Sequence, residues 1–250
     1  MSTSEPAVQR RSGLATVVDI VVSPSTAFAA LREAPTWGWA FLIATALGII
    51  GSLMSAPALM HALGVMLPAK LAASPQIAQL SPDQQQKQIA MIVGIYKVAL
   101  GQFGFVFIPI IILVAALAQG VVLLIGDKIA HGTGSFKQYF ALSVNVSAIG
   151  VGLAQVVVGI IVLVRGADSF DTPTAISGTI PGLALLAPGV HGAAGAALGV
   201  LNVFYLWATV LLALGLQRIG RVRAAAAWIT AIVLLAINVA FAAGGGAQTG

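Results

Sequence analysis

Residues 23–50, SPSTAFAALREAPTWGWAFLIATALGII, contain the transition that decides the fold of this chain. A short segment with Arg32 and Glu33 near its end passes through Pro35 into apolar sequence that carries no charge. A helix needs about 20 apolar residues to cross a hydrocarbon core roughly 30 Å thick. The stretch therefore predicts a helix on the membrane surface that is followed at once by a membrane span.

The whole chain has the composition of an integral membrane protein. Of its 250 residues, 59% are hydrophobic and 8% are charged, whereas soluble domains carry about 25% charged residues. Five segments approach or reach the length of a span, and none has a charged residue in its central run: 37–57, 104–125, 139–164, 197–217 and 224–243. We predict an all-α fold, a polytopic transmembrane helix bundle with five spans plus interfacial amphipathic helices.

The spans divide the chain into three parts. Residues 1–36 form a cytoplasmic tail with interfacial helices, residues 37–243 form the five-span membrane domain, and residues 244–250 form a flexible C-terminus. A cleaved signal peptide does not explain the first span, because the charged region before it is longer than a whole secretory signal of about 15–30 residues.

Cationic residues predict the orientation, because Lys and Arg are enriched in short cytoplasmic loops. The inside set is Arg10, Arg11, Arg32, Lys128, Lys137, Arg218, Arg221 and Arg223, and the outside set is Lys70, Lys87, Lys97 and Arg165. The last three inside residues lie in the short 217–223 segment, which has no acid. Abundant Ala, Gly and Val with few Lys are typical of a GC-rich bacterial genome. We therefore predict a multi-pass protein of the bacterial cytoplasmic membrane, N-terminus inside and C-terminus outside.

The segment before the first span carries four candidate interfacial anchors. Ser23 followed by Pro24 is a helix start, after which Phe28 and Leu31 share one helix face. The anchors are Phe28, Leu31, Trp37 and Trp39, the tryptophans because indole rings favour the membrane interface. The alternative is that the segment is only a hydrophobic tail.

Two further segments lie between the spans. Residues 81–103 open with Ser-Pro-Asp and then repeat apolar residues every three or four positions, which predicts a second amphipathic helix. Pro109 predicts a kink in the second span, unless that span begins after it. Residues 165–196 are rich in Gly and Pro, and we expect either a loop packed on the bundle or a re-entrant segment.

The sequence offers no catalytic, cofactor-binding or metal-binding cluster. It has no cysteine, and the predicted topology puts His61 and His191 outside but His131 inside. The Gly-rich loop near His131 lacks the spacing of a phosphate-binding loop, so Gly132 and Gly134 are interpreted as turn residues. The net charge of +5 is scattered and not gathered into a basic stripe, which argues against nucleic acid. We predict a protein that is not an enzyme, has no cofactor and binds no nucleic acid.

The predicted spans contain uncharged polar residues. The intramembrane candidates are Gln119, Asn145, Ser147, Gln155, Asn202 and Asn238. They could line a path for a neutral solute or hydrogen-bond between helices, which is the commoner use. Residues 195–199 and the Ser143, Ser147 pair have spacings that allow close helix approach.

Four segments together resemble a known family. They are SPSTAFAALREAPTWGWAFLIA before the first span, TGSFKQYFALSVNVSAI (133–149), LNVFYLWATVLLALGLQRI (201–219) and RAAAAWITAIVLL (223–235). This layout resembles the bacterial branch of the Yip1-domain family, and the resemblance extends over residues 14–240. It implies a five-span fold with a cytosolic N-terminus. The chain lacks the long acidic N-terminal region of the eukaryotic members, which contact small GTPases, so the resemblance does not carry that partner over.

Three functions remain open from the sequence, and the last of them is a membrane-embedded enzyme, which would require His131 and Asp127 to converge beneath a lipid-sized cleft. The first is a non-enzymatic scaffold or membrane-organising protein of the Yip1 type, whose partners are membrane lipids and other membrane proteins or further copies of itself. The alternative is a transporter, or the membrane subunit of one, for a neutral solute. Clustering of the polar residues around a cavity would favour the second.

Overall fold

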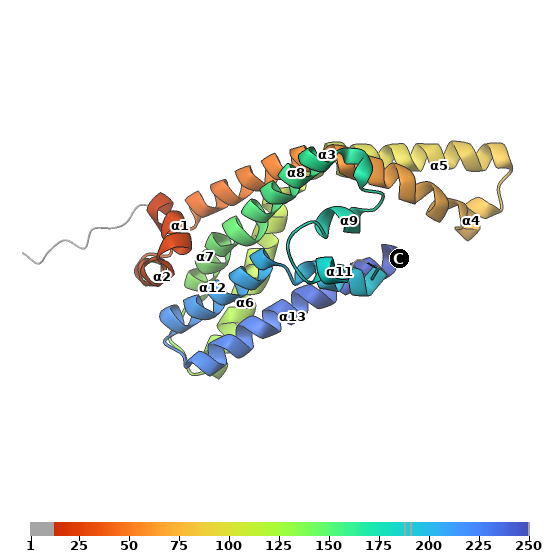
Figure 1. Ribbon diagram of the computed structural model, residues 1–250. Helices are drawn as coiled ribbons and strands as arrows, with labels where there is room; N and C mark the ends of the chain where they lie inside the picture. The colour runs from red at the N-terminus through yellow and green to blue at the C-terminus, as the bar shows by residue number, and fades with distance from the viewer. Residues whose placement is uncertain (1–12, 188, 191, 250) are drawn as a thin grey trace, which may run out of the picture.

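The computed structural model describes residues 13–187, 189–190 and 192–249 (Figure 1). No strand occurs among these residues, which confirms the all-α prediction. The α-helices are α1 (Gly13–Val22), α2 (Pro24–Glu33), α3 (Gly38–Ala72), α4 (Pro75–Ala78), α5 (Pro82–Tyr96), α6 (Ile108–Ile129), α7 (Phe136–Ser147), α8 (Ala154–Arg165), α9 (Pro173–Ser177), α10 (Leu183–Leu186), α11 (Gly192–Val200), α12 (Val203–Gly220) and α13 (Ala224–Thr249). The π-helices η1 (Lys97–Gln102) and η3 (Ala148–Leu153) and the 3-10 helices η2 (Gly104–Phe107) and η4 (Ala167–Ser169) join some of them.

Five helical segments of the described chain are long and apolar enough to cross a membrane, as predicted. They are Gly38–Ala72, Gly104–Ile129, Phe136–Arg165, Val203–Gly220 and Ala224–Gly246. They run alternately along one long axis, so that α1 and α2 lie at one end of the molecule and α13 ends near the other (Figure 1). We call the first the α1–α2 end and the second the hairpin end, because residues 58–102 form a projecting hairpin there (Figure 1).

Three predicted boundaries differ from the structure. The first span does not stop at residue 57, because α3 continues to Ala72. The fourth begins at Val203 and not at 197, because the side chain of Asn202 caps α12. The end predicted to be flexible, 244–250, is helical through Thr249, while Gly250 lies outside the described residues.

The extra length of α3 builds a hairpin that projects from the bundle. At 1.5 Å per residue, its 35 residues are about 52 Å long, roughly 20 Å more than a hydrocarbon core. Helix α5 runs back along this extension (Figure 1). Ser81 and Gln84 form a capping box at the start of α5, which stabilises the predicted amphipathic helix there. We call residues 58–102 the hairpin.

The kink predicted at Pro109 is replaced by a break before it. Pro109 occupies the first turn of α6, where its missing N–H leaves no intrahelical bond unmade. The π-helix η1 and the 3-10 helix η2 precede α6. The chain therefore turns from the hairpin into the second span through irregular helix, and the regular α-helix of that span begins next to the proline.

Small residues bring α3 and the third span together. The buried stripe on α3 alternates steps of four and three residues: Ala44, Gly48, Gly51, Ser55, Ala58 and Ala62. A Cβ added at Gly51 would meet the backbone of Gln155, and one at Gly159 would lie 3.0 Å from the Gly51 carbonyl oxygen. Helices without large side chains at their contact can approach to backbone distance and gain dispersion energy along their length.

The N-terminal helices are docked on the bundle and not only on lipid. Phe28 and Leu31 are fully buried in a core cluster with Leu212, Leu216 and other residues of α7, α12 and α13. This corrects the prediction that Phe28 and Leu31 are interfacial anchors: the face that they share was predicted, but helices of the bundle cover it.

Two hydrogen bonds from α7 reinforce that docking. Gln138 Nε2 donates to the Arg32 carbonyl oxygen at 2.6 Å, and Asn145 Nδ2 donates to the Thr36 carbonyl oxygen at 2.9 Å. Trp37 and Trp39 remain 38% and 54% exposed, positions open to an interfacial role.

Residues 165–196 pack on the bundle at the hairpin end. Helix α9 contacts α3 and α8, and α11 lies along the last turns of α13. A Cβ at Gly246 would lie 2.6 Å from the Ala196 Cβ, so this glycine allows the two helices to approach closely. The structure thus has short packed helices in the place of the predicted loop.

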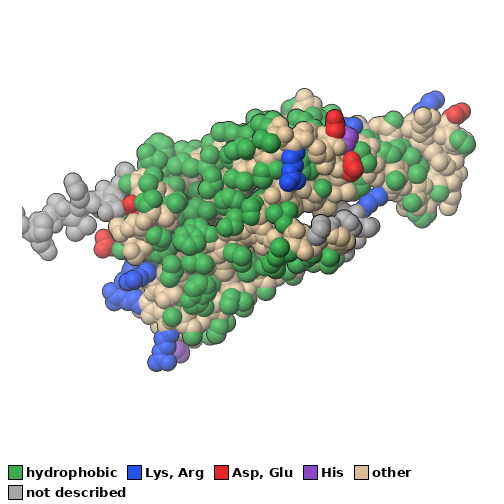
Figure 2. Space-filling view, viewed as in Figure 1, with side chains coloured by type: hydrophobic (Ala, Val, Ile, Leu, Met, Phe, Trp, Pro, Cys, Tyr) green, Lys and Arg blue, Asp and Glu red, His purple; other side chains and the backbone are tan. Residues whose placement is uncertain are grey.

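The side-chain distribution fits a molecule that crosses a bilayer along its long axis. Figure 2 shows hydrophobic side chains covering the middle of this face, with Lys, Arg, Asp and Glu gathered toward its two ends. Large apolar residues of the spans are strongly exposed, among them Ile110 on α6, Leu163 on α8 and Ile229 on α13. Lipid chains would cover these positions.

Candidate functional site

Two cavities adjoin inside the bundle. The α9 cavity, about 400 Å³, lies between α3 and α8 on one side and α11, α12 and α13 on the other, with α9 beside it. The α6 cavity, about 250 Å³, lies between α6, the third span, α12 and α13. Gly150, Val151 and Tyr205 line both. The two cavities therefore share a boundary inside the membrane part of the protein.

Five of the six predicted intramembrane polar residues line these cavities. Gln155 and Asn202 line the α9 cavity. Gln119, Ser147 and Asn238 line the α6 cavity. Residues that lie far apart in the sequence are thus gathered at one place. They come from the second, third and fifth spans and from the residue that caps the fourth, and the first span contributes Ser55 to the same lining.

A local interruption of the third span helps to form the cavities. The π-helix η3, with sequence AIGVGL, joins α7 to α8 and contains Gly150. π-helical turns within a span often mark functional sites. A Cβ at Gly150 would lie 3.3 Å from the Ala208 Cβ, so a larger side chain there would intrude at the boundary between the two cavities.

The α9 cavity is lined by polar groups that also hold the fold together. Asn202 Oδ1 accepts hydrogen bonds from the backbone N–H groups of Phe204 and Tyr205, at 3.0 and 3.2 Å. Gln155 Nε2 donates to Ser55 Oγ at 3.3 Å. Asn202 is therefore first a helix cap, and Gln155 first a link between the first and third spans.

The α6 cavity is lined by the hydroxyl-bearing residues Ser143 and Thr209, which were not among the predicted polar candidates. Ser143 is 1% exposed, and its Oγ has no hydrogen-bond partner among the described residues. Thr209 Oγ1 donates to the Tyr205 carbonyl oxygen at 2.8 Å, and Ser147 Oγ donates to that of Val144 at 2.7 Å. From the sequence, Ser143 was considered only as a small residue. Its position one helical turn before the candidate Ser147 was the signal that could have identified it as a second polar residue of the cavity.

The sixth predicted residue, Asn145, is not part of the cavities. It is 1% exposed, and its Nδ2 donates to the carbonyl oxygens of Thr36 and Ala141. It joins the α2–α3 linker to α7. Its role is a structural hydrogen bond to the linker before the first span, and neither of its two bonds runs to another helix.

The cavities end against the core of the α1–α2 end. Leu212 and Leu234 line the α6 cavity and also belong to the largest buried cluster. That cluster continues through Leu142, Leu216 and Ile219 toward α2. In this conformation the cavities are closed toward the α1–α2 end, so they form a site and not a continuous pore.

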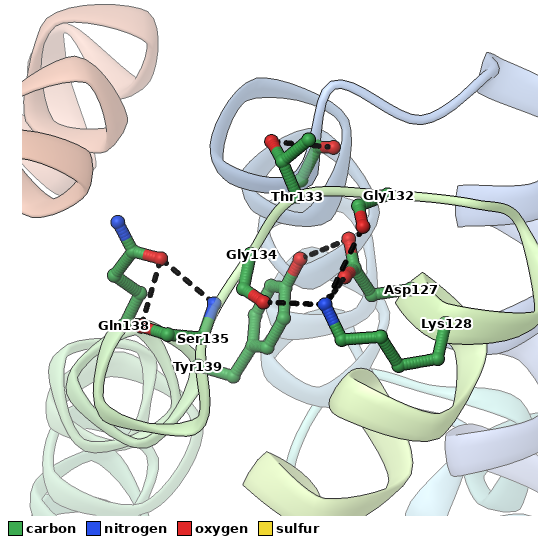
Figure 3. A network of polar contacts seen from close by, with 9 residues as sticks. Asp127, Lys128, Gly132, Thr133, Gly134, Ser135, Gln138 and Tyr139 are labelled. Atoms are coloured by element: carbon green, nitrogen blue, oxygen red, sulfur yellow. Dashed lines mark hydrogen bonds and ion pairs between the residues drawn. The ribbon is translucent and has the colours of Figure 1, made fainter.

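A second polar cluster lies at the α1–α2 end (Figure 3). Asp127, near the end of α6, is fully buried. Tyr139 Oη donates to its Oδ1 at 2.6 Å, and Lys128 Nζ lies 3.1 Å from its Oδ2. Lys128 also donates to the Gly134 carbonyl oxygen at 2.9 Å. A paired and hydrogen-bonded carboxylate can remain buried where an isolated one could not.

Glycines make room for this cluster. A Cβ at Gly132 or Gly220 would meet Asp127 Oδ1, and one at Gly134 would meet Tyr139 Oη. The turn interpretation of Gly132 and Gly134 is consistent with this geometry. The neighbouring Thr133 N–H donates to the Gly220 carbonyl oxygen at 2.9 Å, so the loop after α6 is fastened to the end of α12.

The buried carboxylate was missed by the sequence reasoning. Asp127 lies just beyond the predicted limit of the second span, and nothing local shows that α7 and α12 close over it. Arg218, Arg221 and Arg223, predicted to face the cytoplasm, are exposed at this same end of the bundle. Arg221 adopts a left-handed conformation with φ +57°, which ends α12.

Comparison with known proteins agrees with this architecture. The Yip1 domain matches residues 18–244. Membrane protein YknW of Bacillus subtilis (strain 168) is 29% identical over 244 residues, which cover 95% of this chain and 94% of that protein. No solved structure gave a significant match. Five apolar spans and a match over most of its length lead to one conclusion: this integral membrane protein belongs to the Yip1 domain family.

Proposed function

We propose that this protein is a non-enzymatic membrane scaffold whose hairpin docks another membrane protein. The observation that carries the proposal is the exposure of α5. Every residue of this helix, all of which the structure describes, is at least partly exposed. Met91 and Ile95 are each 59% exposed, and Tyr96 follows them on the same helix.

The position of these side chains favours a protein partner over lipid. The hairpin extends about 20 Å beyond the length that a hydrocarbon core can cover. Its exposed apolar residues continue through Val98 and Leu100 to Phe103, at the start of the second span. Apolar surface exposed beyond the lipid marks an interaction site. A partner that is itself anchored in the bilayer could cover the span and the hairpin together.

Site-specific photo-crosslinking tests this proposal. A benzophenone amino acid at Met91 or Ile95, introduced into the full chain in its native membrane, should capture a defined protein on irradiation. The control position is Ile229, an exposed apolar residue in a span, which should capture mainly lipid. Absence of a protein adduct from both hairpin positions would overturn the proposal.

A pair of variants then tests the side chains themselves. Met91→Ser with Ile95→Ser should abolish capture from a probe at Tyr96. Gln86→Ser with Gln88→Ser changes two exposed polar residues of the same helix and should leave capture unchanged. Equal capture by both double variants would contradict docking through the apolar residues.

Transport of a neutral solute is a second candidate, because polar residues from all five spans line the two cavities. Their closed end requires a further conformation for passage across the membrane. The test is the swelling of vesicles that contain the purified protein, in glycerol or a neutral sugar. Swelling at the rate of protein-free vesicles would exclude these solutes as substrates.

A further inference from the structure

We infer that the α6 and α9 cavities form one binding site for a neutral lipid that carries hydroxyl or ester groups. This inference goes beyond the scaffold proposal, because it concerns the interior of the bundle and needs no protein partner. The two cavities adjoin at Gly150, Val151 and Tyr205. Their volumes, about 400 and 250 Å³, together fall in the range of small-molecule sites.

The lining selects an uncharged ligand. Among the described residues that line the two cavities, none is Asp, Glu, Lys or Arg. The walls are mainly aliphatic, with a few amide and hydroxyl groups between the aliphatic residues. A charged head group would lose its hydration here without gaining a counter-ion, which is costly in a low-dielectric interior. An aliphatic chain with a neutral polar head loses little hydration free energy when it enters the cavity.

Hydroxyl groups point to a ligand that can hydrogen-bond inside the α6 cavity. Ser143 Oγ is buried without a partner among the described residues, and such a group costs free energy until something pairs with it. Ser147 and Thr209 use their hydroxyl protons within their own helices. Their oxygens can still accept a hydrogen bond from a ligand hydroxyl.

Access from the bilayer favours a lipid over a water-soluble molecule. Ile111 on α6 lines the α6 cavity and is 57% exposed on the side that lipid chains would cover. Leu235 on α13 lines the same cavity and is partly exposed. The lining of the cavity thus reaches the lipid-facing surface on α6 and α13, and there we place the entry of a lipid chain. The α9 cavity continues from there toward the hairpin end, beside Pro173 and Ser177.

Photo-labelling of the purified full chain tests the inference. The probe is a monoacylglycerol with a diazirine in its chain and an alkyne for detection, added to the protein in nanodiscs of phosphatidylcholine. Labelled peptides should come from η3, α12 and the 234–242 part of α13, and excess unlabelled monoacylglycerol should remove the label. Label restricted to outward residues such as Ile229, with no competition, would overturn the inference.

Matched variants test the contacts. Ser143→Ala with Thr209→Val removes two hydroxyls while nearly keeping their shape, and should weaken binding about thirtyfold, since two hydrogen bonds of about 1 kcal/mol each are lost together. The control is Thr230→Val, because Thr230 also donates to the carbonyl oxygen four residues before it but does not line either cavity. Equal loss in both variants would contradict a specific site.

Two further measurements keep the result decisive. A fatty-acid probe with the same chain and diazirine should label the cavity peptides at least fivefold less, and equal labelling would refute selection for a neutral head. If the double variant melts at a lower temperature than the wild type, its weaker binding could reflect loss of structure. In that case the competition by unlabelled monoacylglycerol for the wild-type protein alone tests the inference. Failure here leaves the hairpin crosslinking result untouched, so the two proposals are tested separately.

Discussion

At the scale of single residues, the most demanding position is Asp127. A fully buried carboxylate is stable only when its charge is paired and its oxygens are hydrogen-bonded. Tyr139 donates a hydrogen bond to Oδ1 and Lys128 forms an ion pair with Oδ2, and Gly132 and Gly220 leave the space that the carboxylate needs. The cluster fastens the ends of α6, α7 and α12 to one another. Its residues support the fold at the α1–α2 end, while the cavities lie farther along the bundle.

Tyr139→Phe should destabilise the protein measurably. The substitution removes the hydroxyl that donates to Asp127 and leaves the carboxylate with one charged partner, at a cost of about 1–3 kcal/mol. Thermal melting in detergent measures the effect. The control is Tyr96→Phe, because Tyr96 is exposed on α5. Equal melting temperatures for the two variants would show that the hydrogen bond adds nothing to stability.

At the scale of elements, two helix contacts decide the arrangement. Helix α2 fills a face of the bundle with Phe28 and Leu31, and α3 meets the third span along small residues. The first contact resembles the packing of a soluble core. The second depends on close backbone approach, which is how helices associate in a solvent as apolar as their own side chains.

Phe28→Ala should behave as a core substitution. Loss of a fully buried phenylalanine costs about 3–5 kcal/mol, so the variant should melt at a lower temperature in detergent. Phe241→Ala removes the same side chain from a position that is 80% exposed on α13 and should change the melting temperature little. A lipid anchor at Phe28 would instead make the two variants alike.

Gly51→Ala and Gly94→Ala should have opposite effects. On an open helix surface, alanine stabilises relative to glycine by up to about 1 kcal/mol, and a Cβ at Gly94 meets nothing within 4 Å. At Gly51 the new methyl group would press on the backbone of Gln155, at a cost of about 1–3 kcal/mol. Melting temperatures that rise for both variants would disprove the close contact between α3 and α8.

At the scale of the whole molecule, the odd number of spans puts the two ends of the described chain on opposite sides of the bundle (Figure 1). The distribution of Lys and Arg predicts which side is cytoplasmic. On that prediction the exposed arginines after α12 face the cytoplasm, and the hairpin, with the partner that we propose for it, lies on the outer side.

Cysteine labelling tests this orientation cleanly, because the chain has no native cysteine. Lys87→Cys, on the exposed part of α5, should react with a membrane-impermeant maleimide in intact cells. Arg223→Cys, exposed between α12 and α13, should react only after the membrane is permeabilised. The reverse pattern would place the N-terminus outside.

The sequence by itself determined the number of spans, the helical class and the family resemblance. A span is a local property, because the bilayer requires about 20 apolar residues whatever surrounds them. The start of α2 at Pro24 was equally readable, since proline is favoured in the first turn of a helix whatever the rest of the chain does. The polar candidates of the spans were also identified, because an amide in an apolar run is conspicuous in any sequence.

Only the tertiary structure decided which faces meet. The sequence of its own helix allows Phe28 to face either lipid or protein, and packing of α2 against α12 buries it in the protein. Ser143, Gln119 and Asn238 are separated by long stretches of chain, yet they line one cavity because three spans converge there. The length of α3 beyond residue 57 likewise depends on α5, which packs against it. Contacts between distant segments follow from packing and backbone hydrogen bonding, and no local pattern of residues contains them.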